Sequence, residues 1–148
     1  LVMLDGVTDV RNFGAICRTA ECMGFSGVIV AEQGTARIGT DAVKSSAGAL
    51  LRLPVARVKN LVEACSEMGL AGIHIYSVTE KGDMSLEDIT FAAPLCLVLG
   101  DEGKGISRGV LQCSDHGVAI PMSGNIASLN VGVAFGMAAF AVQRQIRK

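Results

Sequence analysis

Three short segments of the chain combine polar side chains with glycines, and their residue types could bind a ligand or take part in catalysis. They are NFGAICRTA at 12–20, LVLGDEGKGIS at 97–107 and IPMSGNIASLNVGVAFG at 120–136. Each sets a carboxylate, amide, hydroxyl or guanidinium near glycine, whose missing Cβ lets a ligand approach the backbone closely. Such segments are typical of binding sites for small polar ligands, although each could also be an ordinary surface turn.

The second segment is a glycine loop that follows the clearest buried strand predicted in the chain, 95–99. Its GxxGxG spacing excludes the dinucleotide fingerprint GxGxxG, and Lys104 lacks the Ser or Thr that follows the lysine of a Walker loop. A glycine loop at the carboxyl end of a parallel strand remains, and open α/β sheets bind ligands there. Asp101 and Glu102 should repel phosphate and favour a cationic or hydroxyl-bearing ligand, unless the loop is an acidic surface turn.

The third segment reads as the end of a strand, a turn and the start of a helix. Pro121 closes the strand predicted at 116–120, because proline cannot donate to a sheet ladder. Ser128 and Asn130 stand where a helix predicted at 127–142 begins, and both residue types favour helix starts. Burial on more than one face is expected, because apolar residues surround this helix: Leu129, Val133, Phe135, Met137 and Phe140.

Arg18 is the most unusual residue of the first segment. It lies in a helix predicted to follow Asn12 and to end at Gly24, among small and apolar residues. Burying a guanidinium in such surroundings costs free energy unless it has an ion-pair partner or a function. The alternative interpretation is a solvated charge on the surface. Neither His74 nor His116 falls in one of the three segments, so the sequence offers no attractive general base.

Strands and helices alternate along the chain, and this order predicts an α/β fold with a mostly parallel sheet and helices on both faces. At 148 residues and 50% hydrophobic content, the chain is long enough for one domain with a proper core. Segment 86–89 is too short to assign. Further strands are expected at 1–4, 27–31, 53–58 and 72–78, and further helices at 40–51, 59–68 and 108–113.

Composition excludes several classes of protein. A formal charge of −1 argues against a nucleic-acid binder held by bulk electrostatics, although it leaves room for a local basic patch. The five cysteines form an odd set without a CxxC pair, which indicates free thiols in a reducing cytoplasm rather than disulfides or zinc ligands. No signal peptide or unbroken apolar run indicates a membrane span. Because Leu1 opens the chain inside an apolar segment, we expect a piece of a longer protein.

In this order and spacing, the three segments resemble the three motifs of the SpoU (TrmH-like) family of RNA ribose 2′-O-methyltransferases, of the SPOUT class. The stretches LDGVTDVRNFGAICRTA and IPMSGNIASLNVGVAFG are similar to its ribosomal-RNA guanosine branch. The resemblance implies one catalytic domain over 1–148, with a C-terminal trefoil knot in the α/β fold. It also implies that the RNA-binding domain that often precedes this one is absent from the sequence.

The resemblance further implies S-adenosylmethionine as the cofactor, without a metal, and homodimers formed through the first and last helices. Transfer to a tRNA ribose, or a non-catalytic knotted module that binds RNA or a partner, are the alternatives to a ribosomal-RNA enzyme. Arg18 would be the catalytic residue, with Asn12, Glu102, Ser128 and Asn130 around it. The cofactor pocket would be formed by Thr79, Leu99, Gly100, Gly103, Ile120, Met122, Ser128 and Leu129.

Overall fold

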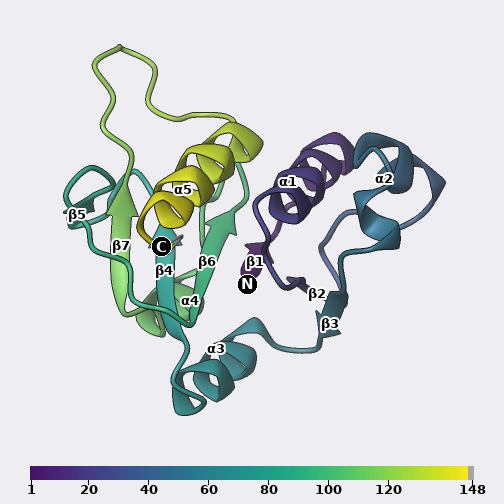
Figure 1. Cartoon of the computed structure of the whole chain (residues 1–148), viewed down its shortest axis with the longest axis horizontal. Helices are drawn as coiled ribbons and strands as arrows, with labels where there is room; N and C mark the ends of the chain where they lie inside the picture. The colour runs from purple at the N-terminus through teal and green to yellow at the C-terminus, as the bar shows by residue number, and fades with distance from the viewer. Residues whose placement is uncertain (147–148) are drawn as a thin grey trace.

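A seven-stranded β-sheet runs through the molecule in the computed structural model, which describes residues 1–146 (Figure 1). The strand order is β3-β2-β1-β6-β4-β7-β5, and every pairing between these neighbours is parallel. This confirms the predicted α/β class, whereas the C-terminal knot stays a prediction from the resemblance. The strands are β1 (Val2–Asp5), β2 (Val28–Ala31), β3 (Val55–Val58), β4 (His74–Val78), β5 (Met84–Ser85), β6 (Leu95–Gly100) and β7 (His116–Ala119).

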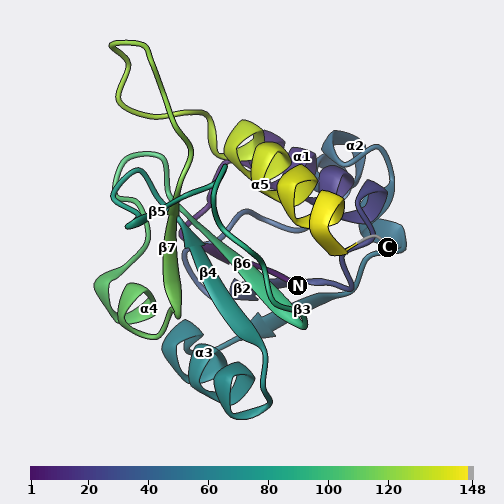
Figure 2. The ribbon, with the colours of Figure 1, turned by 60° about the vertical axis from the view of Figure 1, so that its left-hand side comes forward.

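Helices cover both faces of the sheet (Figure 2). One face carries α1 (Val10–Cys22), α2 (Thr40–Ser45), the short 3₁₀ helix η1 (Ala49–Leu51) and α5 (Val131–Ile146). The other carries α3 (Leu61–Leu70) and α4 (Arg108–Gln112). No helix within residues 1–146 is long and apolar enough to cross a membrane.

The central strands supply side chains to two separate cores. In β6, Leu95, Leu97 and Leu99 pack under α1 and α5, whereas Cys96 and Val98 pack under α3 and α4. Successive side chains of a strand point to opposite faces, so a strand covered on both sides must be apolar throughout. The continuous apolar run that the sequence displays at 95–99 follows from this double burial.

The helix predicted at 40–51 is broken in the structure. Ala47 and Gly48 adopt the left-handed region with φ of 50° and 83°, which ends α2 and separates it from η1. Gly39 takes the cap position of α2. α2 also packs tightly on α1, because a Cβ added at Gly14 would lie less than 3.0 Å from Ser45.

The last helix begins later than the sequence predicts. α5 starts at Val131 rather than at residue 127, and residues 121–130 form a loop in which every residue is exposed. Asn130 is the residue that caps the helix, because its Oδ1 accepts hydrogen bonds from the amides of Gly132 at 2.9 Å and Val133 at 3.2 Å. Ser128 therefore lies in the loop, two residues before the cap.

Within one chain α5 is buried on one face only, contrary to the prediction from its composition. Phe135 is 0% exposed, whereas Ile146 at the end of the helix and three large apolar side chains before it lie open to solvent. We call these three residues the α5 stripe: Val133 at 52%, Met137 at 43% and Phe140 at 56% exposure. They follow one another at helical spacing, so they form a single apolar surface.

All five cysteines are free, as the odd count predicted. Burial raises the pKa of Cys17 and of Cys96 to about 12 and that of Cys65 to about 11. Cys22, by contrast, is exposed at the end of α1, and Cys113 is partly exposed.

Alkylation of the native protein at pH 8 should therefore separate the thiols into two groups. The thiolate is the reactive form, and its fraction falls about tenfold for each unit by which the pKa rises. Iodoacetamide followed by mass spectrometry should label Cys22 first and Cys113 more slowly. Cys17, Cys65 and Cys96 should react only after unfolding, and rapid native labelling of Cys17 or Cys96 would contradict the packing described above.

Candidate active site

The carboxyl ends of β1 and β6 mark a point where the chain turns to opposite faces of the sheet. After β1 the chain passes through α1 on one face, whereas after β6 it passes through α4 on the other. Loops that diverge in this way leave a crevice, and open parallel sheets bind ligands in it. Asp5 and Gly100, the last residues of the two strands, are direct partners in the β1–β6 ladder.

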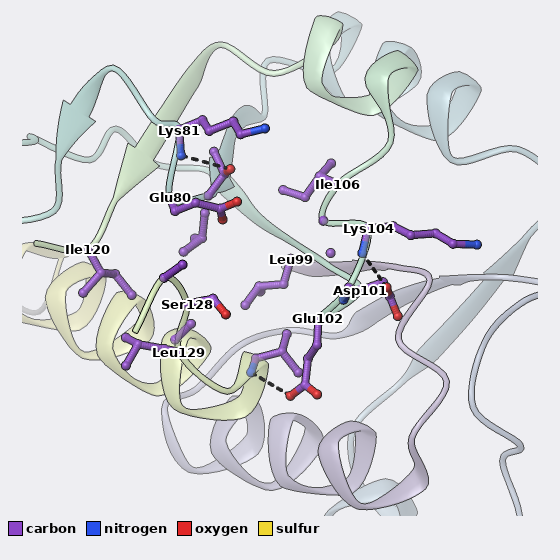
Figure 3. A pocket seen from close by; sticks show the side chains of 18 of the residues that line it. Glu80, Lys81, Leu99, Asp101, Glu102, Lys104, Ile106, Ile120, Ser128 and Leu129 are labelled. Carbon is purple, nitrogen blue, oxygen red and sulfur yellow. Dashed lines mark hydrogen bonds between the residues drawn. The ribbon is translucent and has the colours of Figure 1, made fainter. Parts of the chain in front are cut away.

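A pocket of about 370 Å³ opens at this edge of the sheet (Figure 3). Its wall comes from the ends of β4 and β6, the glycine loop, the segment after β7 and the first turn of α5. Small-molecule sites in proteins typically enclose about 300–1,000 Å³, so the size suits a cofactor. The wall contains every cofactor position that the resemblance indicated: Thr79, Leu99, Gly100, Gly103, Ile120, Met122, Ser128 and Leu129.

Other residues of the wall were not among the predicted cofactor positions. Most of them adjoin a predicted position, and Ala134 lies on the same side of α5 as Val131, three residues before it, which also lines the pocket. Figure 3 shows Lys104 pointing away from the pocket, whereas the Ser128 hydroxyl points into it. The additional residues are Val78, Glu80, Lys81, Asp101, Lys104, Gly105, Ile106, Ala127, Val131 and Ala134.

The glycine loop is held by its own hydrogen bonds. The Oδ1 atom of Asp101 accepts hydrogen bonds from the amides of Gly103 at 2.9 Å and Lys104 at 2.7 Å. The amide of Gly105 donates to the carbonyl oxygen of Asp101 at 2.8 Å and closes the loop. The sequence suggested that Asp101 faces a ligand, but its carboxylate shapes the loop instead, as aspartate commonly does in turns.

Gly100 allows the two ends of this loop to touch. A Cβ at this position would lie less than 3.0 Å from the backbone atoms of Gly105 and Ile106. Backbone atoms cannot move aside as a flexible side chain can, so even alanine would push the loop away from β6. This close approach, rather than an unusual φ angle, is the reason that glycine is required here.

Glu102 lies where the three segments meet. Its Oε1 atom accepts hydrogen bonds from Nδ2 of Asn130 at 2.8 Å and Nδ2 of Asn12 at 3.1 Å. It also accepts from the amide of Val131 at 3.4 Å (Figure 3). Asn130 also donates from Nδ2 to Oδ1 of Asn12 at 2.9 Å. We call Asn12, Glu102 and Asn130 the Glu102 cluster, and it joins one residue from each segment.

The orientation of Asn130 follows from its role as a helix cap. Its side-chain oxygen accepts from two amides of α5, so its side-chain nitrogen faces the Glu102 carboxylate. A carboxylate at the N-terminus of a helix is also favoured by the helix dipole. The start of α5 and the position of Glu102 therefore depend on each other.

The structure does not bring Arg18 into the pocket wall. Its side chain lies on the exposed face of α1, two turns after Arg11, and makes no ion pair within residues 1–146. At the start of this helix Asp9 caps the first turn, and hydrogen bonds from the amides of Asn12 and Arg11 lower the pKa of its carboxyl group. Among the described residues no cluster of His, Cys, Asp or Glu could hold a metal ion.

Comparison with known proteins identifies the family. Residues 1–140 match the model of the SpoU rRNA Methylase family. This chain belongs to the SpoU family. The resemblance seen in the three segments is thereby confirmed, and it holds over nearly the whole SpoU chain.

One curated relative, from Mycobacterium avium (strain 104), is named "Uncharacterized tRNA/rRNA methyltransferase". It is 40% identical over 147 residues, which cover 99% of this chain and 48% of the relative. The SpoU chain thus spans about half the length of the curated relatives that it matches.

Two solved structures of methyltransferases resemble the SpoU chain closely. The SpoU methyltransferase AviRb from Streptomyces viridochromogenes, in complex with AdoMet, aligns with a TM-score of 0.88 and 33% identity over 97% of this chain and 59% of its own. An AdoMet-bound rRNA methyltransferase from Sinorhizobium meliloti aligns with a TM-score of 0.89 and 27% identity over 98% of this chain and 56% of its own.

Replacing Gly100 by alanine should destabilise the SpoU chain by about 1–3 kcal/mol, the usual cost of forcing extra atoms into a packed site. Gly69 is the matched control, because it lies in α3 and a Cβ there meets nothing within 4 Å. Gly69→Ala should stabilise the helix by about 0.5–1 kcal/mol. Urea unfolding measures both, and an equal effect of the two substitutions would show that Gly100 is not sterically required.

Proposed function

We propose that this SpoU chain transfers a methyl group from S-adenosylmethionine to a ribose 2′-hydroxyl in structured RNA, with guanosine in ribosomal RNA as the target. One observation carries the proposal: the Glu102 cluster joins all three motifs at the edge of a pocket lined by the second and third. The AdoMet complex of AviRb, a relative of the same family, supports the choice of cofactor. The five free thiols favour the reducing cytoplasm as the compartment.

The composition of the pocket fits this cofactor. Leu99, Ile106 and Ile120 offer apolar surface for an adenine ring, and Gly100 and Gly103 leave backbone groups open to it. The carboxylate of Glu102 in the pocket wall favours a cation such as a sulfonium or an ammonium group. When bound, the cofactor supplies an activated methyl group on its sulfonium.

The residues of the chain orient the reactants rather than activate the hydroxyl with a base. The Glu102 cluster fixes Asn12 and Asn130, and a fixed arrangement of reacting groups lowers the entropic part of a barrier. His74 and His116 are the first residues of β4 and β7, so they lie at the opposite edge of the sheet from the pocket. We propose that the hydroxyl proton leaves to water or to an RNA phosphate.

Arg18 is proposed to act on the bound RNA. A guanidinium keeps its proton up to a pKa above about 12, which makes it a poor base. It can instead stabilise the developing alkoxide of the ribose or hold a neighbouring phosphate. Its exposed position on α1, outside the pocket wall, suits contact with RNA better than contact with the cofactor.

Arg18→Ala should lower the single-turnover rate of methyl transfer to substrate RNA by about 10²–10³-fold, the usual loss on removing one such donor. The dissociation constant for S-adenosylmethionine should stay unchanged, since Arg18 does not line the pocket. Arg18→Lys should restore only part of the rate, because an ammonium lacks the planar fork of guanidinium.

Arg11→Ala is the matched control for this experiment. Arg11 is exposed on the same helix, and its only ion pair within residues 1–146 is with Asp9. Its removal should change the rate by less than about twofold, as expected for an exposed ion pair. Equal losses of the single-turnover rate in Arg11→Ala and Arg18→Ala would show that Arg18 has no specific role in methyl transfer.

The proposed activity is tested by titrating the protein with S-adenosylmethionine in a calorimeter and by mapping ribose methylation in RNA from a deletion strain. The proposal expects binding, and one guanosine of ribosomal RNA that loses its 2′-O-methyl group. A missing group in tRNA would move the target to tRNA. Binding without any missing group would favour a non-catalytic module, and a flat titration at millimolar ligand would refute the cofactor.

We also propose a homodimer formed through α1 and α5. The α5 stripe exposes three large apolar side chains on one face of the helix, a typical feature of interaction surfaces, and α5 packs beside α1 (Figures 1 and 2). A groove of about 390 Å³ next to the stripe could receive side chains of a second copy. Its wall includes Leu86, Pro121, Met137 and Phe140.

Sedimentation should give twice the mass of one protomer, which is 15.3 kDa for the 148 residues of this sequence. Phe140→Glu should yield folded monomers, because a carboxylate cannot be buried in an apolar interface without a partner. Leu70→Glu is the control, since Leu70 is 91% exposed at the end of α3 on the opposite face of the sheet. A monomeric wild-type protein at micromolar concentration would contradict the dimer.

A further inference from the structure

Asp5 lies outside the pocket wall but touches the glycine loop that forms part of it. Its Oδ2 atom accepts a hydrogen bond of 2.7 Å from the amide of Ser107, which is 102 residues away in the chain. Ser107 directly follows the glycine loop and precedes α4, and its own side chain does not cap that helix. A bond to a charged acceptor is stronger than one between neutral groups.

The same residue also meets the other end of the loop. Asp5 is the partner of Gly100 in the β1–β6 ladder, and Gly100 is the residue from which the loop departs. Gly6, which follows Asp5 with φ of 79°, turns the chain beneath the loop, where a Cβ would lie 3.4 Å from Cβ of Asp101. One residue at the end of β1 therefore contacts the first and the last residue of the 100–107 segment.

Asp5 and Asp101 have different roles, because the hydrogen bonds of Asp101 lie within the loop whereas that of Asp5 connects the loop to the sheet. Asp101 sets the shape of the loop through bonds to Gly103 and Lys104. Those bonds would survive a rigid movement of the whole loop, because both partners lie within it. The bond from Ser107 to Asp5 would break in such a movement, because Ser107 follows the loop whereas Asp5 belongs to β1 of the sheet.

We infer that Asp5 is a positioning residue for the cofactor pocket: it fixes the glycine loop on the sheet, and with it Glu102 and the pocket wall from Gly100 to Ile106. The inference rests on the proposed function, because the pocket is taken to hold S-adenosylmethionine. Asp5 itself does not touch the pocket, so it acts only through the loop. Without the Asp5 carboxylate, the loop must be ordered when the cofactor binds, and this ordering lowers the affinity.

Three variants of the full-length protein test this inference. Asp5→Ala removes the acceptor, whereas Asp5→Asn keeps a side-chain oxygen that can accept from Ser107. Asp115→Ala is the matched control, because Asp115 accepts an equally short bond of 2.7 Å from the amide of Ile75 near the amino end of β4. That bond also joins distant residues, but it lies at the opposite edge of the sheet from the pocket.

Calorimetry with S-adenosylmethionine should show that Asp5→Ala raises the dissociation constant by about 10-fold, the value of one hydrogen bond to a charged group. Asp5→Asn should stay within about threefold of wild type. Asp115→Ala should lower the melting temperature but leave the dissociation constant within about twofold. Equal affinities in Asp5→Ala and wild type, or equal losses in Asp5→Ala and Asp115→Ala, would overturn the inference.

Amide hydrogen exchange gives a second measurement that needs no cofactor. Exchange at Ser107 should accelerate in Asp5→Ala and stay at the wild-type rate in Asp115→Ala, because only the first variant frees this amide. Unchanged exchange at Ser107 in Asp5→Ala would refute the positioning role. If the wild-type protein binds no S-adenosylmethionine but exchange at Ser107 still accelerates in Asp5→Ala, the proposed function would be refuted, whereas the bond between Asp5 and Ser107 would be confirmed.

Discussion

The arrangement of the candidate site depends on one carboxylate. Glu102 accepts hydrogen bonds from Asn12, which is 90 residues away in the chain, and from Asn130, which is 28 residues away. A single acidic side chain thus holds the start of α1, the glycine loop and the start of α5 at one edge of the sheet. Removing it would take the acceptor from Nδ2 of Asn12 and from the amide of Val131, whereas Nδ2 of Asn130 would keep its bond to Asn12.

The glycine loop is built before any ligand arrives. Its two acidic side chains are occupied by donors of the protein itself, Asp101 by amides of the loop and Glu102 by the two asparagines. Gly100 lets the ends of the loop touch, so the loop stands on β6 as a closed unit. A site whose wall is already ordered spends little of its binding free energy on folding that wall.

α5 connects the pocket with the surface proposed for dimerisation. Its first turn contributes Val131 and Ala134 to the pocket wall, and its outer face carries the α5 stripe. The cap at Asn130 belongs both to this helix and to the Glu102 cluster. A partner that packs on the stripe would therefore contact the same helix that contributes to the pocket wall.

The sequence by itself determined the features that depend on neighbouring residues. Apolar runs such as 95–99 gave the buried strands, the alternation of elements gave the parallel α/β class, and the three motifs indicated which positions line the pocket. Tertiary structure alone decided that the helix expected at 40–51 breaks at Ala47 and that α5 starts at Val131. It also decided that Arg18 lies outside the wall and that Asp5 holds the glycine loop. The positions of Arg18 and Asp5 depend on strand order and on contacts between residues far apart in the chain, which no local pattern of residue types encodes.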